Sequence, residues 1–188
     1  MAGRAFGAVY EIIRQRKRDL TLMCGGGTEE ISMLVGAGCV KRLVNAYRGL
    51  ETWGLCHSVR RAVEQGVPHP VQIEEYSLLS MTAGFIAAAV GVPFMPVKSL
   101  LGSDIIEVST FKGNGKLRII ECPFTGEKVV VPALPPDVAI VHAQRADCYG
   151  NVQMWGFLGD DLWAVRAAKK VVITVEEVVD EEIIRKPE

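Results

Sequence analysis

The sequence has little net charge and no regular spacing of cysteines. Lysine and arginine together number 21 and aspartate and glutamate 22, so the formal net charge is −1, and no overall field attracts nucleic acid or an acidic membrane surface. The cysteine count is odd and no pair has the C-x-x-C spacing of zinc or redox sites; the five are Cys24, Cys39, Cys56, Cys122 and Cys148. We therefore expect free thiols in a reducing compartment, the cytoplasm.

The sequence also has no feature that predicts a secretory leader or a membrane span. The first ten residues contain no continuous apolar run, so we expect no signal peptide. The longest apolar stretch, Leu78 to Val97, contains Pro93 and Pro96, and a helix that ends at Gly91 is too short to cross a bilayer. This stretch is better explained as a buried helix followed by an apolar strand.

Nucleotide-binding loops of the familiar kinds are absent. A glycine cluster, Gly25–Gly27, follows the apolar run Leu20–Cys24, but neither the G-x-G-x-x-G spacing nor a G-K-[ST] sequence occurs there. Thr28 is expected to cap the helix that follows. Glu29 and Glu30 place negative charge at the positive end of that helix, which disfavours a bound phosphate. The cluster either lets the backbone approach a ligand closely or forms a tight strand-to-helix turn, and the sequence favours the two equally.

Short apolar runs alternate with amphipathic segments along the chain. Of the 188 residues 49% are apolar, which suits one globular domain. Helices are predicted at Ala5–Lys17, Glu29–Val35, Ser58–Gln65, Glu75–Val90 and Asp161–Lys169. Strands are predicted at Leu20–Cys24, Val40–Tyr47, Val71–Glu74, Leu117–Cys122, Lys128–Val131, Val138–His142 and Val171–Val175. This alternation predicts an α/β fold with a single open, mainly parallel sheet and helices on both faces.

Two polar segments could carry function. Ser99–Gly115 has no clear period and is expected to be a loop. Gln144–Asn151 follows a buried strand, and ligands of α/β sheets gather beyond strand ends. Asp147 and Gly150 are turn formers that favour a hairpin corner there. His142 stands alone at the strand end, where a structural role is more common than a catalytic one.

The order of the motifs resembles the first, or A (alpha), subunit of the family I coenzyme A transferases. The segment D-V-A-I-V-H-A-x-x-A-D-x-x-G-N-V begins at Asp137 and is followed by a helix with A-A-K and by V-V-I-T-V-E-E-V-V. Upstream, L-V-G-A-G-x-V-K-R-L, E-E-Y-S and P-F-T-G-E-K-V-V-V-P-A-L occur in the order of the same subunit. The nearest pattern within the family is that of glutaconate coenzyme A transferase, and the resemblance covers essentially the whole chain.

The resemblance implies the NagB-like fold of that family and transfer of coenzyme A from an acyl thioester to a carboxylic acid, with a dicarboxylic or 3-oxo acid expected. In the family, a glutamate of the B (beta) subunit in an S-E-N-G-like motif attacks the thioester and becomes a glutamyl thioester. No glutamate of this chain follows a serine and precedes a glycine-bearing turn. We therefore expect no catalytic nucleophile here, no metal and no permanently bound cofactor. We expect a coenzyme A thioester as substrate and, as partner in a hetero-oligomer, a B subunit.

The resemblance also bears on the two ends of the sequence. The family's A subunit begins with a strand and a glycine-rich turn before the helix that opens this chain, and it continues beyond V-E-E-V-V-D-E-E-I-I-R. We expect residues 1–188 to form a single A-subunit domain that lacks the family's first strand and its C-terminal part.

The expected contribution of this chain is a pocket for the acid's carboxylate and a contact surface for the B subunit. An arginine fork suits a dicarboxylic acyl group, and hydroxyl and backbone N–H groups suit its remaining oxygens. Trp53 and Trp155 are candidate interface aromatics. The candidate substrate-binding residues are Gly25, Gly26, Gly27, Arg48, Ser58, Arg60, Ser99, Gly102 and Ser103.

Two alternatives stay open. A related branch of the family opens a ring in a coenzyme A thioester with a glutamate of the A-like chain, which makes Glu75 the alternative catalytic residue. The competing interpretation of Glu75 is a solvated side chain at a helix N-terminus. The same fold also serves non-catalytic ligand-binding domains.

Overall fold

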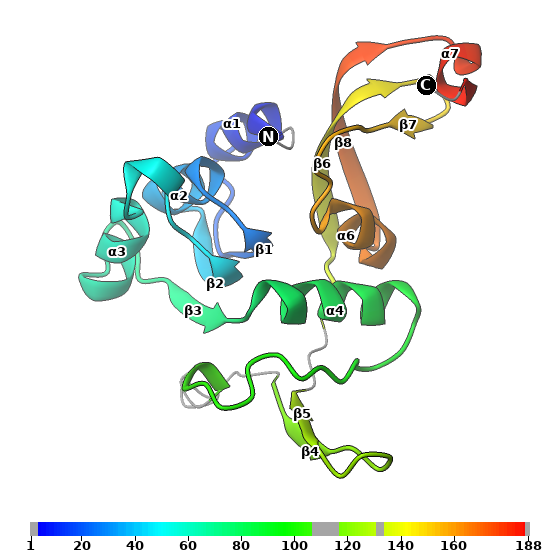
Figure 1. Ribbon diagram of the computed structural model, residues 1–188. Coiled ribbons are helices and arrows are strands. Elements are labelled where there is room, and N and C mark those ends of the chain that lie inside the picture. The colour runs from blue at the N-terminus through cyan, green and yellow to red at the C-terminus, as the bar shows by residue number, and fades with distance from the viewer. Residues whose placement is uncertain (1–3, 107–116, 131–133, 187–188) are drawn as a thin grey trace.

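The structure is a computed structural model that describes residues 4–106, 117–130 and 134–186. Figure 1 shows two groups of strands joined by helix α4, with a small hairpin on the far side of that helix. The predicted loop Ser99–Gly115 lies outside the described residues from position 107 onward. The last residue of the predicted strand Lys128–Val131 also lies outside them.

The first group of strands is a parallel sheet, sheet A, with the order β1-β2-β3. Its strands are β1 (Leu20–Gly26), β2 (Val40–Tyr47) and β3 (Gln72–Glu75), and the helices that connect them are α2 (Glu29–Gly36) and α3 (His57–Glu64). A short 3-10 turn, η1 (Glu51–Trp53), precedes α3. Parallel neighbours require such crossover connections, so the alternation in the sequence produced this arrangement.

Helices α1 (Phe6–Arg14), α2 and α3 cover one face of sheet A. The apolar stripes predicted on these helices meet the buried side chains of β1 and β2 in one core. Its fully or nearly fully buried members include Val9, Ile31, Leu34, Val35, Leu43 and Val59.

The beginning of α2 corrects one expectation. Thr28 occupies the N-cap position, but its side chain accepts no hydrogen bond from the helix backbone, and its hydroxyl contacts Glu29 instead. The backbone at Thr28, with φ −128° and ψ −100°, lies outside the extended region that aims a capping oxygen at the first turn. The predicted end of the helix is confirmed, because α2 stops at Gly36 and Gly38 takes a left-handed φ of +70°.

Helix α4 (Leu78–Ala89) packs on the other face of sheet A. It begins three residues later than the predicted Glu75, because residues up to Glu75 extend β3 and Ser77 forms a reciprocal capping box with Ser80. The second hydrophobic core, which forms around α4, contains Val44, Tyr76, Met81, Phe85, Ile106, Leu117 and Leu134. In the described parts of the chain, no helix has the length and apolar character needed to cross a membrane.

The second group, sheet C, has the order β7-β6-β8. Its elements are β6 (Val138–Ala146), β7 (Val152–Gln153), α6 (Asp161–Ala167), β8 (Lys170–Val178) and α7 (Glu181–Arg185). Strands β6 and β8 are parallel and β6 and β7 are antiparallel. Helix α6 connects β7 to β8 and packs against α4, which ties this sheet to the rest of the domain.

The predicted hairpin corner lies between β6 and β7. The Asp147 carboxylate accepts hydrogen bonds from the backbone N–H groups of Tyr149 and Asn151, both at 2.9 Å. Gly150 has a φ of +87°. The pKa of Asp147 is lowered, first by the side-chain bond from Asn151, so the charged carboxylate stabilises the turn.

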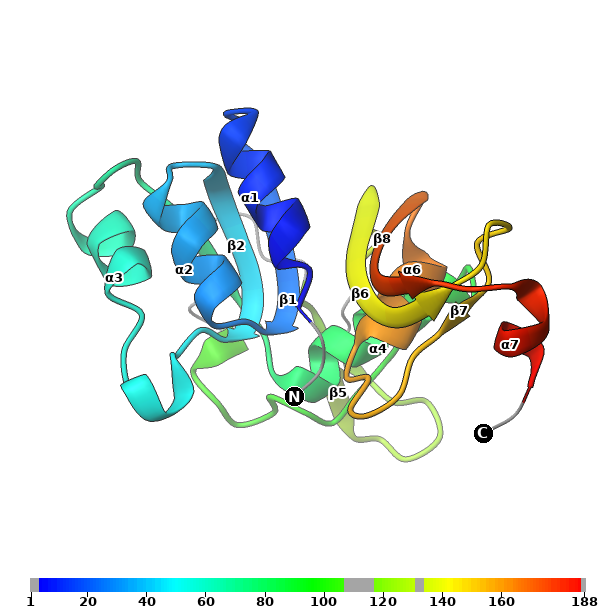
Figure 2. The ribbon, with the colours of Figure 1, turned by 90° about the horizontal axis from the view of Figure 1, so that it is seen from above.

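The third sheet is a two-stranded antiparallel hairpin of β4 (Ile119–Glu121) and β5 (Lys128–Val130). The α/β class is confirmed, but the described strands form three sheets and not the single sheet that we expected. The reason is that no described strand lies between β1 and β6, which face each other across a groove (Figure 2).

Candidate functional site

The carboxyl ends of the three strands of sheet A lie side by side. Gly26 of β1 is paired with Tyr47 of β2 in the parallel register. Asn45 of β2 is paired with Glu75 of β3. Ligands of open α/β sheets bind beyond this edge, which we call the carboxyl edge. It brings together three predicted features: the glycine cluster, Arg48 directly after β2, and Glu75.

The three glycines of the cluster differ in what surrounds them. A Cβ added to Gly25 would stand 2.0 Å from Oδ2 of Asp160. A Cβ added to Gly27 would stand 2.4 Å from Cδ1 of Ile31. Close packing therefore explains both of these glycines. Gly26 is exposed and a Cβ there would meet nothing within 4 Å, so its backbone is open to a ligand.

Arg48 and Glu75 form an ion pair at the carboxyl edge. Nη1 of Arg48 donates to Oε1 of Glu75 at 3.0 Å, and the two side chains are 32% and 29% exposed. Glu75 is the last residue of β3 and not a solvated residue of α4, because the helix begins after Ser77. The pair holds the guanidinium where a carboxylate from solvent can reach it.

A buried acidic group lies one residue before this pair and was not predicted. The side chain of Glu74 is buried, and the Tyr76 hydroxyl donates to its Oε1 at 2.8 Å. Burial, followed by the charge of Glu74, raises the pKa of Tyr76 far above its usual range. Within the described residues, Oε2 of Glu74 and Oδ1 of the buried Asn45 have no hydrogen-bond partner.

The hydroxyls near the start of α4 fall into two groups. Ser99 contacts the hydroxyl of Ser77, whose oxygen also accepts from the backbone N–H of Ser80 at 3.1 Å. Since α4 follows β3 directly, Ser99 lies next to the carboxyl edge. Gly102, with a φ of +76°, and Ser103 lie in the turn that follows. The Ser103 hydroxyl is buried and has no partner among the described residues.

Two predicted substrate-binding residues lie on α3 and not at the carboxyl edge. The Ser58 hydroxyl is buried between helices, 2.9 Å from the hydroxyl of Ser32. The guanidinium of Arg60 binds Glu64 one helical turn away, at 2.9 Å and 3.1 Å. Both side chains therefore have structural partners where the fold has placed them, and neither lines the groove described next.

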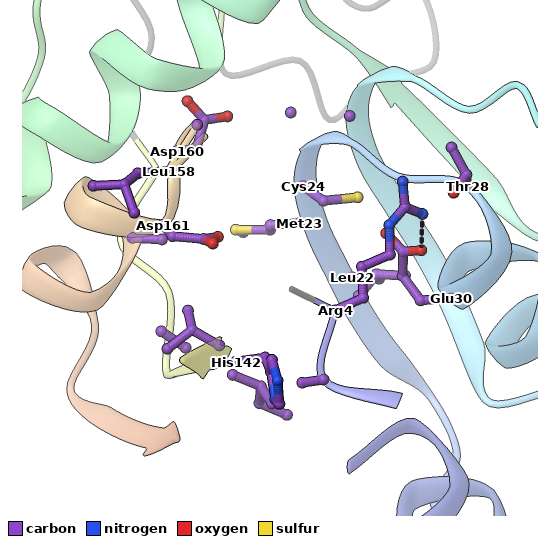
Figure 3. A pocket seen from close by; sticks show the side chains of 18 of the residues that line it. Arg4, Leu22, Met23, Cys24, Thr28, Glu30, His142, Leu158, Asp160 and Asp161 are labelled. Carbon is purple, nitrogen blue, oxygen red and sulfur yellow. Dashed lines mark hydrogen bonds and ion pairs between the residues drawn. The ribbon is translucent and has the colours of Figure 1, made fainter. Parts of the chain in front are cut away.

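A groove of about 970 Å³ lies between β1 and β6. Helix α1 lines one side, and α4 and α6 line the other. Asp160 and Asp161, at the start of α6, point into it (Figure 3). The Asp160 carboxylate accepts from the Thr82 hydroxyl of α4. Burial, followed by the charge of Asp160, raises the pKa of Asp161 to about 6.

Other polar side chains along the groove have structural roles. Burial raises the pKa of the Cys24 thiol to about 12, so it is not a thiolate near neutral pH. Nδ1 of His142 lies 2.8 Å from the Thr174 hydroxyl, and Nε2 lies 3.6 Å from Glu176. Within residues 4–106, 117–130 and 134–186, no three His, Cys, Asp or Glu side chains are placed to hold a metal ion.

Comparison with known proteins gives the family. A sequence model described as "Coenzyme A transferase" matches residues 1–188. The chain belongs to the coenzyme A transferase family. It is 41% identical over 175 residues to the A subunit of the 3-oxoadipate CoA-transferase of Pseudomonas knackmussii, covering 93% of this chain and 60% of that protein.

Two further relatives match nearly the whole chain at lower identity. The A subunit of the glutaconate CoA-transferase of Acidaminococcus fermentans is 36% identical over 197 residues, which cover 98% of this chain and 61% of that protein. The crystal structure of that enzyme superposes with a TM-score of 0.84 at 34% identity, covering 95% of this chain and 59% of the other. One chain of the cholesterol ring-cleaving hydrolase of Rhodococcus jostii is 30% identical over 192 residues, covering 94% of this chain and 60% of that one.

The chain thus spans about 60% of the length of these relatives. The predicted resemblance to family I A subunits and the family fold are confirmed. The assignment of substrate-binding residues stays a prediction.

Proposed function

We propose that this chain is the A-type half of a coenzyme A transferase that works together with a B subunit in a hetero-oligomer. The observation that carries the proposal is the similarity, over nearly the whole chain, to two transferase A subunits at 41% and 36% identity. Both relatives are named as one subunit of their enzyme, which supports a partner chain. The five cysteines are free thiols, as suits the reducing cytosol in which we place the enzyme.

The proposed reaction passes through a glutamate of the B subunit. Its carboxylate attacks the acyl carbon of the thioester, the C–S bond breaks, and coenzyme A thiolate leaves an acyl–glutamyl anhydride. The thiolate then attacks the glutamyl carbonyl and releases the first acid, which leaves a glutamyl thioester. The carboxylate of the second acid attacks this thioester, the C–S bond breaks, and coenzyme A thiolate leaves a second acyl–glutamyl anhydride. The thiolate then attacks the acyl carbon of this anhydride, which forms the new thioester and frees the glutamate.

Three of the carboxylates described above are engaged by partners, which fits a nucleophile that lies on the partner chain. Glu74 is buried against Tyr76, and Asp160 is bonded to Thr82. Glu75 is paired with Arg48. A nucleophile needs an exposed oxygen directed at the substrate, and each of these three carboxylates is occupied by a partner.

We assign the recognition of the acid to the carboxyl edge. Arg48 uses Nη1 for Glu75, and its remaining N–H groups can bind a second carboxylate, such as the distal one of a dicarboxylic acid. The exposed backbone of Gly26 and the hydroxyl of Ser99 supply neutral donors at the same edge. We also assign Gly102 and Ser103, in the adjoining turn, to binding of the acid. Ser58 and Arg60, on α3, are left out of the proposed site.

The test is reconstitution. The chain is co-expressed with a candidate B subunit, and coenzyme A transfer is measured from acetyl- or glutaryl-coenzyme A to dicarboxylic and 3-oxo acids. Transfer that needs both chains supports the proposal. Full transfer by this chain alone, or purified two-chain complexes without transfer to any of these acids, contradicts it.

A second candidate is hydrolysis of a ring in a coenzyme A thioester. Similarity at 30% identity to one chain of a ring-cleaving hydrolase favours it, as does the position of Glu75 at the carboxyl edge. The substitution Glu75→Gln separates the two candidates. Ring hydrolysis would lose at least about 100-fold in kcat without its acid–base group, whereas transfer through a B-subunit glutamate would keep most of its kcat.

A further inference from the structure

Asn45 is a fully buried amide in a strand whose other buried residues are apolar. β2 is the middle strand of sheet A, and its buried members besides Asn45 are Val40, Leu43 and Val44. A strand that is covered on both faces is normally apolar along its length, because a polar group taken out of water lowers stability unless it is hydrogen-bonded. An amide at this position therefore needs an explanation.

Only one half of the Asn45 amide has a partner. Nδ2 donates to the backbone carbonyl of Tyr47 at 2.9 Å. Among the residues that the structure describes, Oδ1 has no hydrogen-bond partner. A buried acceptor without a partner destabilises the folded chain. The amide is thus a poor residue for stability at this position, and the donor is the half that the fold uses.

Packing alone does not account for this choice. Leu43, two residues earlier on the same face of β2, belongs to the core that α1, α2 and α3 cover. Val44, on the opposite face, belongs to the core around α4. A leucine at position 45 would continue the first core and would bury no unpartnered oxygen. What leucine lacks is a donor for the Tyr47 carbonyl.

The Tyr47 carbonyl is also held from a second side. The backbone N–H of Gly27, directly after β1, donates to the same oxygen at 3.1 Å. The backbone carbonyl of Asn45 in turn accepts from the N–H of Tyr76, directly after β3, at 3.0 Å. The ends of all three strands of sheet A are therefore joined by hydrogen bonds around Asn45.

Holding the Tyr47 carbonyl sets the direction in which Arg48 leaves the sheet. The carbonyl oxygen lies in the plane of the peptide bond that joins Tyr47 to Arg48, so two donors on that oxygen fix the plane. Arg48 then extends to Glu75, with Nη1 3.0 Å from Oε1. Glu75 is the residue that is paired with Asn45 in the register of β2 and β3. Asn45 therefore fixes the backbone on which the ion pair depends.

We propose that Asn45 is a positioning residue: it donates to the Tyr47 carbonyl and thereby holds the Arg48 guanidinium where it receives the distal carboxylate of a dicarboxylic acid. The inference rests on the proposed function, since it needs Arg48 to bind that acid. Asn45 acts through Arg48 and not by contact with the substrate. Its donor sets the preference for dicarboxylic over monocarboxylic acids, and its unpartnered oxygen lowers the stability of the fold.

The experiment uses the reconstituted enzyme of this chain and a candidate B subunit. Asn45→Leu keeps about the size of the side chain and removes the donor. It should raise the KM for glutarate at least about five-fold and change kcat less than about two-fold. The KM for acetate should stay unchanged, because acetate has no distal carboxylate for Arg48. The urea midpoint of unfolding should equal or exceed that of the wild type, since the unpartnered oxygen is gone.

Two further variants separate positioning from packing. The side chain in Asn45→Ser is too short to reach the Tyr47 carbonyl but stays polar, and this variant should raise the KM for glutarate as Asn45→Leu does. It carries the test if Asn45→Leu does not fold. Val44→Ala removes bulk from the neighbouring residue, which is also fully buried. It should lower the urea midpoint and leave the ratio of the two KM values unchanged.

Hydrogen exchange tests the same hold without any reaction. In the full chain without a partner, both Asn45 variants should speed exchange in residues 46–50 at least about three-fold and leave residues 20–23 of β1 unchanged. If the wild-type complex transfers no coenzyme A, the proposed function fails. Exchange in residues 46–50 then still decides whether Asn45 holds the segment that carries Arg48.

Four outcomes overturn the proposal. An unchanged KM for glutarate in an active complex means that Arg48 does not depend on Asn45. Equal rises in the KM for glutarate and for acetate mean a general loss of structure at the site. Unchanged exchange in residues 46–50 means that the amide does not hold this segment. Failure of both Asn45 variants to fold means that the amide serves the fold as a whole.

Discussion

The carboxylate of Asp160 lies directly over Gly25, so close that a Cβ on the glycine would stand 2.0 Å from Oδ2. The two residues are far apart in sequence, and they join the end of β1 to the start of α6. Thr82 of α4 holds the same carboxylate. This contact therefore links β1 of sheet A to α6, the helix that connects β7 and β8 of sheet C.

The first prediction is that Gly25→Ala destabilises the domain while Gly26→Ala does not. The added methyl at position 25 must displace a carboxylate that Thr82 fixes, which should lower the free energy of unfolding by about 1–2 kcal/mol. At Gly26 a methyl enters open space. Urea unfolding measures both. The double variant Gly25→Ala with Asp160→Ala should lose less than the sum of the single variants, and a strictly additive result would argue against the contact.

The second prediction concerns Tyr76. Tyr76→Phe removes the hydroxyl that donates to the buried Glu74 and should cost about 2–3 kcal/mol of unfolding free energy, since a buried charged acceptor loses its partner. Tyr149→Phe is the control, because that side chain is 76% exposed. Glu74→Gln in the Tyr76→Phe background should recover part of the loss. If Glu74→Gln recovers nothing, the loss in Tyr76→Phe comes from the missing hydroxyl itself and not from an unpartnered carboxylate at Glu74.

The third prediction is a pH dependence set by Asp161. Its pKa is about 6 in the folded protein and near 3.8 when exposed, so the folded state holds a proton that the unfolded chain releases between these values. Stability from this group is therefore present below about pH 4 and is lost as the pH rises to about 6. Because the side chain is partly exposed, we expect the loss to be under about 2 kcal/mol.

The substitution Asp161→Asn tests this sign. Compared with the wild type, it should gain unfolding free energy at pH 7.5 and gain little or none at pH 4. Asp137→Asn, an exposed acid whose pKa is lowered by Lys169, should show no such gain at pH 7.5. A variant at position 161 that is destabilised only at pH 7.5 would reverse the sign and refute the assignment.

The fourth prediction concerns recognition of the acid. In the reconstituted enzyme, Arg48→Gln should raise the KM for a dicarboxylic acid at least about ten-fold and change kcat less, because the lost contact is to a non-reacting carboxylate. Arg48→Lys should recover only part of the affinity, since lysine has no bidentate fork. Arg60→Gln, on α3, is the matched control and should leave KM unchanged. A kcat that falls while KM stays constant would assign Arg48 to the reaction itself.

The elements that could be predicted were those that depend on local pattern. Apolar runs located the strands of sheet A and both long strands of sheet C, and turn chemistry located the corner at Asp147. The predicted start of α4 was three residues too early, because Glu75 is the last residue of β3 and the helix begins only after Ser77. The capping serine, Ser77, was the better signal.

The site was predicted less fully, because its geometry depends on contacts distant in sequence. Proximity in sequence suggested that Arg60 belonged with Arg48, but α3 carries Arg60 away to pair with Glu64. The pairing of Asp160 with Gly25 has no local signature. Glu74 and Glu75 are neighbours in sequence, but strand alternation directs one side chain to the core and the other to Arg48.

We propose that the covalent chemistry takes place on a partner chain and not on this one. The most direct measurement is intact-mass analysis of each chain after the reconstituted complex has been incubated with acyl-coenzyme A and without acceptor acid. The proposal predicts a mass increase on the B subunit, equal to coenzyme A held as a glutamyl thioester, and none on this chain. A coenzyme A adduct on a glutamate of this chain would contradict it.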